Sequence, residues 1–86
     1  MVIQYLSSFK KQYQKLAPKL QQQFHLRLLQ LLNNPTDPRL RIHPLKGTYA
    51  GYWSMNVTGD VRAIYLLRGD DVIIFALIGT HSELYG

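Results

Sequence analysis

Residues able to move protons or hold phosphate gather near predicted strand ends and turns in the second half of the chain. They are His43, Lys46, Asp60, Arg62, His81 and Tyr85. Imidazole, with an unperturbed pKa of about 6.5, exchanges protons near neutral pH. Such a set is sufficient to cut RNA without a metal, because the 2′-hydroxyl is the nucleophile. The protein then has only to take that proton, protonate the leaving oxygen and stabilise the charge on the phosphorane.

Other kinds of catalytic site lack their residues in this sequence. The chain has no cysteine, which excludes thiol catalysis and disulfides and fits a cytoplasmic protein. His43 and His81 are far apart, and no His-x-x-x-His accompanies them, so the spacing does not indicate a zinc site. A phosphate-binding glycine loop, a Gly-x-Ser-x-Gly motif and an acidic pair for glycoside cleavage are also missing. We therefore expect no cofactor.

Each of these residues also has a purely structural interpretation. A single histidine is more often a surface or capping residue than a catalyst, and His25, in the middle of a predicted helix, is assigned to that class. Arg62 has apolar neighbours on its own face of a strand and must reach a partner or a groove, because a half-buried cation is costly to leave unpaired. An ion pair with Asp60 or Glu83 would satisfy it without any catalytic role. The sequence leaves both interpretations open.

Charge is distributed unevenly along the chain. Residues 1 to 48 carry eight Lys and Arg against one acidic residue, a net charge of +7, whereas residues 49 to 86 have a net charge of −2. A basic face on a small domain favours a polyanion such as RNA, although a solvated Lys-rich helix surface has the same composition. If RNA is the partner, we expect Lys10, Lys11, Arg41 and Lys46 to bind it.

Length and composition predict a single globular domain over residues 1–86. The 86 residues are too few to supply two cores, and 47% are hydrophobic while 17% are charged. No apolar run approaches the ~18 to 20 residues that a membrane span needs, so no membrane partner is expected. The opening MVIQYLSSFKK does not resemble a signal peptide.

The first half of the chain predicts a helical hairpin. Ser7 or Ser8 can cap a first helix, and Pro18 suits the first turn of a second. The first helix has an apolar stripe of Phe9, Tyr13 and Leu16, and the second has Leu20, Phe24, Leu28 and Leu31, widened by Leu29 and Leu32. The segment NNPTDP ends the second helix, because proline cannot continue it.

The second half predicts an antiparallel meander. YWSMNV alternates, VRAIYLL and VIIFALI follow as further strands, and the turns TGD and RGDD separate the three. The last strand is apolar on both faces and should lie inside the sheet. The expected fold is therefore α+β, a two-helix hairpin packed on a small antiparallel β-sheet whose other face forms a concave surface. The expected core contains Phe24, Leu28, Trp53, Tyr65 and Phe75.

The segment from His43 to Tyr85 resembles the RelE/YafQ group of bacterial toxins from type II toxin–antitoxin systems. The motifs that carry the likeness are Leu-x-Gly in HPLKG, Gly-Asp-x-Arg-x-x-Tyr in GDVRAIY, and Gly-Thr-His followed by an aromatic residue in GTHSELY. The helical hairpin agrees with that group in layout only. The resemblance implies a RelE-like two-layer fold.

Toxins of this group are ribosome-dependent, metal-independent mRNA endonucleases that inhibit translation and are silenced by a cognate antitoxin protein. The resemblance therefore implies the ribosome and mRNA as partners, and a toxin–antitoxin hetero-oligomer. By position, His43 matches the histidine before Pro-Leu-x-Gly, and His81 the one in Gly-Thr-His. Asp60, Arg62 and Tyr85 match the turn aspartate, the strand arginine of RelE-like members and the terminal aromatic residue.

Two positions depart from the pattern of YafQ-like toxins. Asn56 stands where they have a further histidine, and Leu77 where they have an arginine on the last strand. We expect Arg62 to replace the missing arginine. Two other functions remain open: a ParE-like toxin that inhibits DNA gyrase and cuts nothing, and an inactive relative. The gyrase alternative requires neither His43 nor His81.

Overall fold

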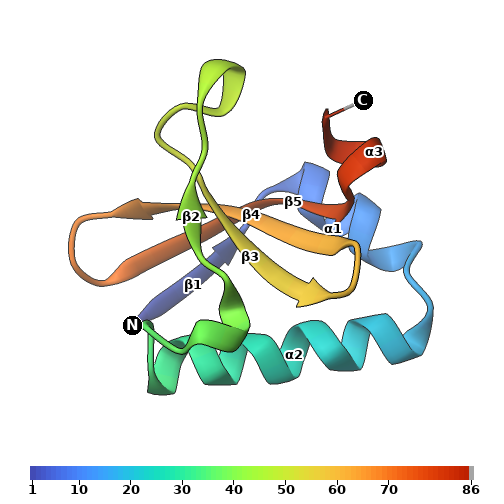
Figure 1. Ribbon diagram of the computed structural model, residues 1–86, viewed down its shortest axis with the longest axis horizontal. Coiled ribbons are helices and arrows are strands. Elements are labelled where there is room, and N and C mark those ends of the chain that lie inside the picture. Colours follow the sequence, from blue (N-terminus) through green and yellow to red (C-terminus); the bar gives the residue numbers. More distant parts are fainter. Residues whose placement is uncertain (86) are drawn as a thin grey trace.

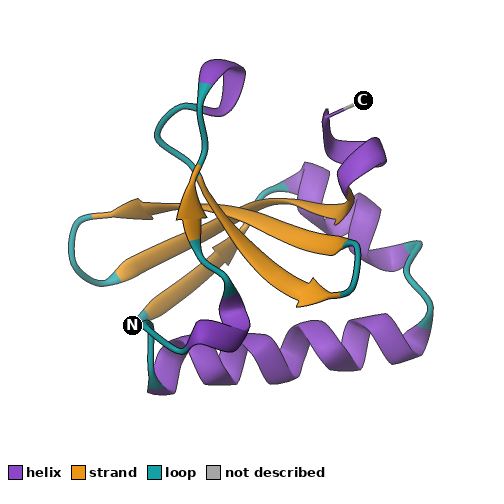
Figure 2. Ribbon diagram, viewed as in Figure 1, coloured by secondary structure: helices purple, strands orange, loops and turns teal. Residues whose placement is uncertain are grey.

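The computed structural model describes residues 1–85 as an α+β protein with one five-stranded sheet in the order β1-β5-β4-β3-β2. Its strands are β1 (Val2–Tyr5), β2 (His43–Pro44), β3 (Trp53–Thr58), β4 (Val61–Arg68) and β5 (Val72–Thr80). Its helices are α1 (Ser7–Gln14), α2 (Pro18–Asn33) and α3 (His81–Tyr85), with 3₁₀ turns η1 (Pro38–Leu40) and η2 (Gly47–Tyr49). The predicted helices on a sheet, and the antiparallel meander β3–β4–β5, are confirmed (Figure 2).

Strand β5 is an interior strand that lies between β4 and β1, as its apolar sequence predicts. Its pairing with β4 is antiparallel, but that with β1 is parallel, with Val2 opposite Val72 and Tyr5 opposite Phe75. The expectation of a purely antiparallel sheet is therefore wrong at this edge. The opening segment is too short to show strand periodicity, and its partner lies near the other end of the chain, so only the tertiary structure reveals the pairing.

The prolines predicted the bounds of α2 correctly, whereas the serines did not predict the cap of α1. Pro18 is the first residue of α2, where its missing N–H costs nothing, and α2 ends at Asn33 before the Pro-rich segment. The predicted serine cap of α1 is wrong, because Leu6 occupies the cap position and no side chain caps this end. The Ser8 hydroxyl instead donates to the carbonyl oxygen of Ala76 in β5, at 2.6 Å.

An aromatic cluster joins the helices to the sheet. Phe75 on β5 is fully buried, and its ring centroid lies 5.1 Å from that of Phe24 and 5.7 Å from that of Phe9. Burial is confirmed for Phe24, Leu28, Tyr65 and Phe75, whereas Trp53 is only partly buried against the core. Leu29 and Leu32 retain 50% and 41% exposure, because α2 contacts the sheet through the narrower stripe of Phe24, Leu28 and Leu31.

Helix α1 protects the part of β5 that β1 does not reach. Beyond Phe75, the backbone of β5 is paired on this side by two side chains one helical turn apart, Ser8 to the Ala76 carbonyl and Gln12 to Ile78. The Gln12 Oε1 atom accepts the Ile78 N–H at 2.9 Å. These bonds satisfy an edge that would otherwise be open, and they fix the strand end from which α3 begins.

Different elements lie on the two faces of the sheet. Figure 1 shows α2 running along one face, while α3 and the turn between β2 and β3 project on the opposite side. On β4, Arg62 lies between Val61 and Ala63, which belong to the core that packs against α2, so its side chain is on the sheet face away from α2. Among residues 1–85, none of the helices combines the length and apolar character needed to span a bilayer.

Candidate functional site

A cavity of about 320 Å³ lies at the end of the sheet where α3 begins. The residues that line it are His43, Leu45, Arg62, His81 and Tyr85. Four of these five were selected from the sequence, and they come from β2, β4 and α3. The cavity is thus the place where residues distant in the sequence meet.

Strand register explains in part why these residues lie close together. Arg62 on β4 lies opposite Asn56 on β3 and Gly79 on β5. His81 follows Gly79 by only two residues. The register that pairs Arg62 with Gly79 therefore places Arg62 near the start of α3. His43 comes to this face from β2, where it pairs with Ser54 of β3.

The chain turns from β5 into α3 through a reciprocal cap. The Thr80 N–H donates to Glu83 Oε1 at 2.8 Å, and the Glu83 N–H donates to Thr80 Oγ1 at 3.2 Å. This capping box lowers the pKa of Glu83, first through the backbone hydrogen bond from Thr80 and then through its side chain. Helix α3 was not predicted from the sequence, although Thr-x-x-Glu after a strand is a recognisable helix start.

Within α3, His81 and Tyr85 are four residues apart and so lie on the same face. Their ring centroids are 4.7 Å apart with an interplanar angle of 57°. The first turn of α3 lies against Gly79 of β5, where a Cβ atom would lie 3.2 Å from Glu83 Oε1. Glycine at this position allows the close approach of α3 to β5.

Arg62 makes no ion pair within the part of the chain that the structure describes. The predicted structural partner Glu83 is occupied by the cap of α3, and no bond joins Arg62 to Asp60. The Nε atom of Arg62 is buried and has no hydrogen-bond partner among residues 1–85. The ion pair with Asp60 or Glu83 that would give Arg62 a purely structural role is therefore not formed among residues 1–85, and Arg62 lines the cavity.

The backbone near His43 determines which of its nitrogens can act as a base. The Nδ1 atom lies 3.1 Å from the carbonyl oxygen of Arg41, which can only accept a hydrogen bond. Nδ1 therefore carries the proton in this bond, and Nε2 of the neutral ring retains a lone pair. Arg41 adopts a left-handed conformation with φ of 47° at the end of η1, and this turn directs its carbonyl toward His43.

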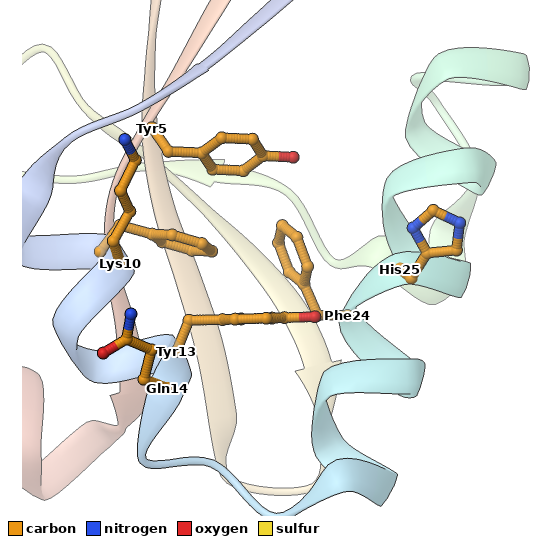
Figure 3. Close-up of a pocket in the computed structure, with 7 residues that line it drawn as sticks. Tyr5, Lys10, Tyr13, Gln14, Phe24 and His25 are labelled. Atoms are coloured by element: carbon orange, nitrogen blue, oxygen red, sulfur yellow. The ribbon is translucent and has the colours of Figure 1, made fainter.

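Other predicted site residues lie outside the cavity lining. Asp60 is in the turn between β3 and β4, and Lys46 directly precedes η2, next to the lining residue Leu45. Lys10 and Lys11 are on α1. Lys10 lines a separate cavity of about 350 Å³ between α1 and α2, together with Tyr5, Phe9, Tyr13, Gln14, Phe24 and His25 (Figure 3). His25 thus belongs to this second cavity, consistent with its structural assignment.

Besides the lining residue Leu45, Tyr49 next to the cavity was not predicted from the sequence. Tyr49, in η2, donates its hydroxyl to the carbonyl oxygen of Leu84 at 3.3 Å, and its ring lies edge-on to Tyr85. Nothing in the sequence links these positions, because they are distant along the chain.

Residues 1–85 contain no group of three or more His, Cys, Asp or Glu side chains placed to hold a metal ion.

Comparison with known proteins decides which family has this arrangement. The family described as "Bacterial toxin of type II toxin-antitoxin system, YafQ" matches residues 1–86. The chain belongs to this YafQ family. The mRNA interferase toxin YafQ of Escherichia coli strain K12 is 39% identical over 62 residues, which make up 69% of this chain and 66% of that protein, slightly less than two thirds of its length.

Solved structures of YafQ share the fold along nearly the whole chain. YafQ from Escherichia coli strain BL21(DE3) has a TM-score of 0.81 at 31% identity, covering 98% of this chain and 97% of that one. A structure of the Escherichia coli DinJ-YafQ toxin-antitoxin complex matches with a TM-score of 0.69 at 32% identity, covering 98% and 96%. The RelE/YafQ resemblance and the α+β fold that it implied are confirmed.

Two positions distinguish this site from the pattern described above for YafQ-like toxins. Asn56 lies directly opposite Arg62 in the β3–β4 register, so Arg62 is next to the position of the missing histidine. Leu77 is half-buried on β5 opposite Ile64 and does not line the cavity. Among the residues that line the cavity, Arg62 is the only Arg or Lys.

Proposed function

We propose that this chain is the toxin of a type II toxin–antitoxin pair and inhibits translation as a ribosome-dependent, metal-independent mRNA endonuclease. The observation that carries the proposal is the single cavity lined by His43, Arg62, His81 and Tyr85. Membership of the YafQ family and the similarity to a protein named mRNA interferase toxin support it. Together, two imidazoles, a guanidinium and an aromatic ring supply what RNA cleavage through the 2′-hydroxyl requires.

The two histidines share proton transfer in this mechanism. His43 acts as the base, since its Nδ1 is held by the Arg41 carbonyl and its Nε2 can take the proton of the 2′-hydroxyl. The 2′-oxygen attacks phosphorus, and the bond to the 5′-oxygen breaks, leaving a 2′,3′-cyclic phosphate. His81 gives a proton to the departing 5′-oxygen. Each such group typically contributes about 10²- to 10⁴-fold in rate.

The other residues position the RNA. Arg62 stabilises the charge that develops on the phosphorane, because its side chain lines the cavity and makes no ion pair among residues 1–85. Tyr85 stacks on a base of the codon, as aromatic side chains commonly do with unpaired RNA. Lys46, beside Leu45 of the lining, holds a neighbouring phosphate, and Asp60 orients an adjacent group from its turn.

The basic helices provide a wider electrostatic surface. Lys10 and Lys11 on α1 and Arg41 near β2 contact RNA of the message or the ribosome outside the cavity. A cognate antitoxin of acidic composition binds the same basic side in a toxin–antitoxin hetero-oligomer, consistent with the structural similarity to the DinJ-YafQ complex. These partners place the activity in the cytoplasm. RNA affinity should fall steeply with salt, since phosphate binding releases counterions.

The test is cleavage of a defined mRNA by purified protein on programmed ribosomes, with a metal chelator present. Discrete cuts within codons are expected for the unaltered chain, and His81→Ala or His43→Ala should reduce the rate by about 10²-fold or more. The matched control is His25→Ala, which removes an imidazole from the other cavity and should cut normally. Wild-type rates in both histidine variants, or a requirement for added metal, would refute the mechanism. Intact mRNA together with inhibited DNA gyrase would support the ParE-like alternative.

A further inference from the structure

Tyr49 connects the loop after β2 to the C-terminal helix. Its hydroxyl donates to the Leu84 carbonyl at 3.3 Å. Its ring centroid lies 5.8 Å from that of Tyr85 at an interplanar angle of 77°, an edge-to-face contact. The Tyr49 ring also contacts that of Tyr52, with ring centroids 6.1 Å apart and an interplanar angle of 87°. Four rings, of Tyr52, Tyr49, Tyr85 and His81, therefore follow one another in contact from the loop to the cavity.

Helix α3 depends on such outside contacts. It has five residues, far fewer than an isolated helix needs to be stable in water. Its start is held by the Thr80–Glu83 cap, and Leu84 anchors it to the protein with only 7% of its surface exposed. The carbonyls of a last helical turn have no partner inside the helix, and the Tyr49 hydroxyl supplies one for Leu84. Tyr49 therefore fixes the end of α3 opposite the cap.

We infer that Tyr49 is a positioning residue for the cavity, which sets the placement of His81 and Tyr85 relative to Arg62 and His43. This inference rests on the function proposed above for that cavity. Tyr49 is not among the residues that line the cavity, so it acts through Tyr85, whose ring contacts both Tyr49 and His81. A misplacement of about 1 Å in a reacting group can cost ~10²-fold in rate, so a loose α3 would impair cleavage strongly.

The alternative role of Tyr49 is to stabilise only its own loop. In that case its loss would lower the melting temperature without changing the surroundings of the His81 ring. A matched pair of variants separates the two roles. Tyr49→Phe removes the hydroxyl that reaches Leu84, whereas Tyr52→Phe removes a hydroxyl from the same loop that makes no hydrogen bond to α3 among the described residues. Tyr49→Ala removes the ring contact as well.

The test combines cleavage kinetics on programmed ribosomes with NMR of the His81 imidazole carbon-bound protons in the isolated protein. We expect Tyr49→Ala to lower kcat by about 10- to 100-fold, with a smaller change in KM, and to move the His81 resonances as its ring-current environment changes. Tyr49→Phe should show a lesser effect in the same direction, and Tyr52→Phe should match the unaltered chain in both measurements.

Unchanged His81 resonances in a folded Tyr49→Ala variant would overturn the inference, as would shifted resonances with an unchanged kcat. If Tyr49→Ala does not fold, the same two criteria apply to Tyr49→Phe, which retains the ring. The NMR measurement needs no cleavage. Failure of the proposed nuclease function would therefore appear separately, as an unaltered chain that cuts nothing.

Discussion

Thr80 and Glu83 cap each other's backbone across the first turn of α3, with the Thr80 N–H 2.8 Å from Glu83 Oε1 and the Glu83 N–H 3.2 Å from Thr80 Oγ1. Thr80 is the last residue of β5, and Glu83 lies in α3 between His81 and Tyr85, which line the cavity. The geometry of the proposed active site therefore depends on a carboxylate that does not itself line the cavity.

The order of α3 is expected to depend on pH through Glu83. The folded-state pKa of Glu83 lies below its ordinary value of 4.5, because the ionised carboxylate accepts hydrogen bonds from Thr80. Its stabilising contribution is thus present above pH 4.5 and is lost as the pH falls through the lower, folded-state pKa. Hydrogen exchange of the Thr80 amide, followed against pH, should show protection decreasing in that acidic range. Glu83→Gln, which retains an acceptor but does not titrate, should remove this pH dependence, and persistence of the dependence would contradict the assignment.

Arg62→Met should separate catalysis from stability. The change keeps an unbranched apolar stem but removes the buried Nε that has no partner within residues 1–85. Since such a group costs about 1–3 kcal/mol, we expect the free energy of unfolding in urea to stay constant or rise by about 1 kcal/mol. Cleavage should fall by about 10²- to 10³-fold, the usual effect of losing one donor to a developing oxyanion. Arg68→Met, at the exposed far end of β4, is the control and should cut normally. A clear loss of stability in Arg62→Met would mean that Arg62 has a structural partner.

Gln12→Ala should loosen the end of β5 that leads into α3. The Ile78 N–H would lose the Gln12 side chain that accepts its hydrogen bond, at a cost of about 1–3 kcal/mol if the group remains unsatisfied. Faster hydrogen exchange at Ile78 should accompany the loss of stability. Gln14→Ala changes an exposed glutamine of the same helix and should alter stability by no more than about 0.5 kcal/mol. Equal effects of the two variants would argue against the role of Gln12.

Phe75→Ala should remove a large part of the stability of the domain. Its ring is fully buried and contacts Phe9, Phe24 and Tyr65. Truncation of such a residue costs about 3–5 kcal/mol, against a typical total of about 5–15 kcal/mol for a whole domain. Urea unfolding checks this, with the exposed Leu29→Ala expected to change stability by about 0.5 kcal/mol or less. A comparable loss in Leu29→Ala would show that the outer face of α2 is also packed.

Tyr85 should act through its ring more than through its hydroxyl. Its ring contacts His81 and Tyr49, and its hydroxyl makes no hydrogen bond within the described residues. Tyr85→Phe should therefore cut nearly normally. Tyr85→Ala should raise KM by about 10-fold or more, since one stacked base contributes about 1–3 kcal/mol. Equal impairment by the two variants would instead assign the main role to the hydroxyl.

The local elements and the kinds of residue at the site could be predicted from the sequence. The helix-breaking prolines at positions 18 and 35 bounded α2, and the two-sided apolar pattern of VIIFALI placed β5 inside the sheet. The motifs around His43, Arg62 and His81 identified the family, and these residues do line one cavity. These features are local, since capping, periodicity and residue chemistry depend on residues that are close together in the sequence.

The contacts between groups far apart in the chain could not be predicted from the sequence. The parallel pairing of Val2 with Val72, the Gln12 bond to Ile78 and the Tyr49 bond to Leu84 all join segments far apart in the chain. The absence of an ion pair at Arg62 among residues 1–85 could not be predicted either, because Glu83 was equally suited to an ion pair or a helix cap. Glu83 forms the cap because β5 ends at Thr80 and α3 starts at the next residue. Such choices follow from strand register and packing, which pair residues by position in space rather than by order in the sequence.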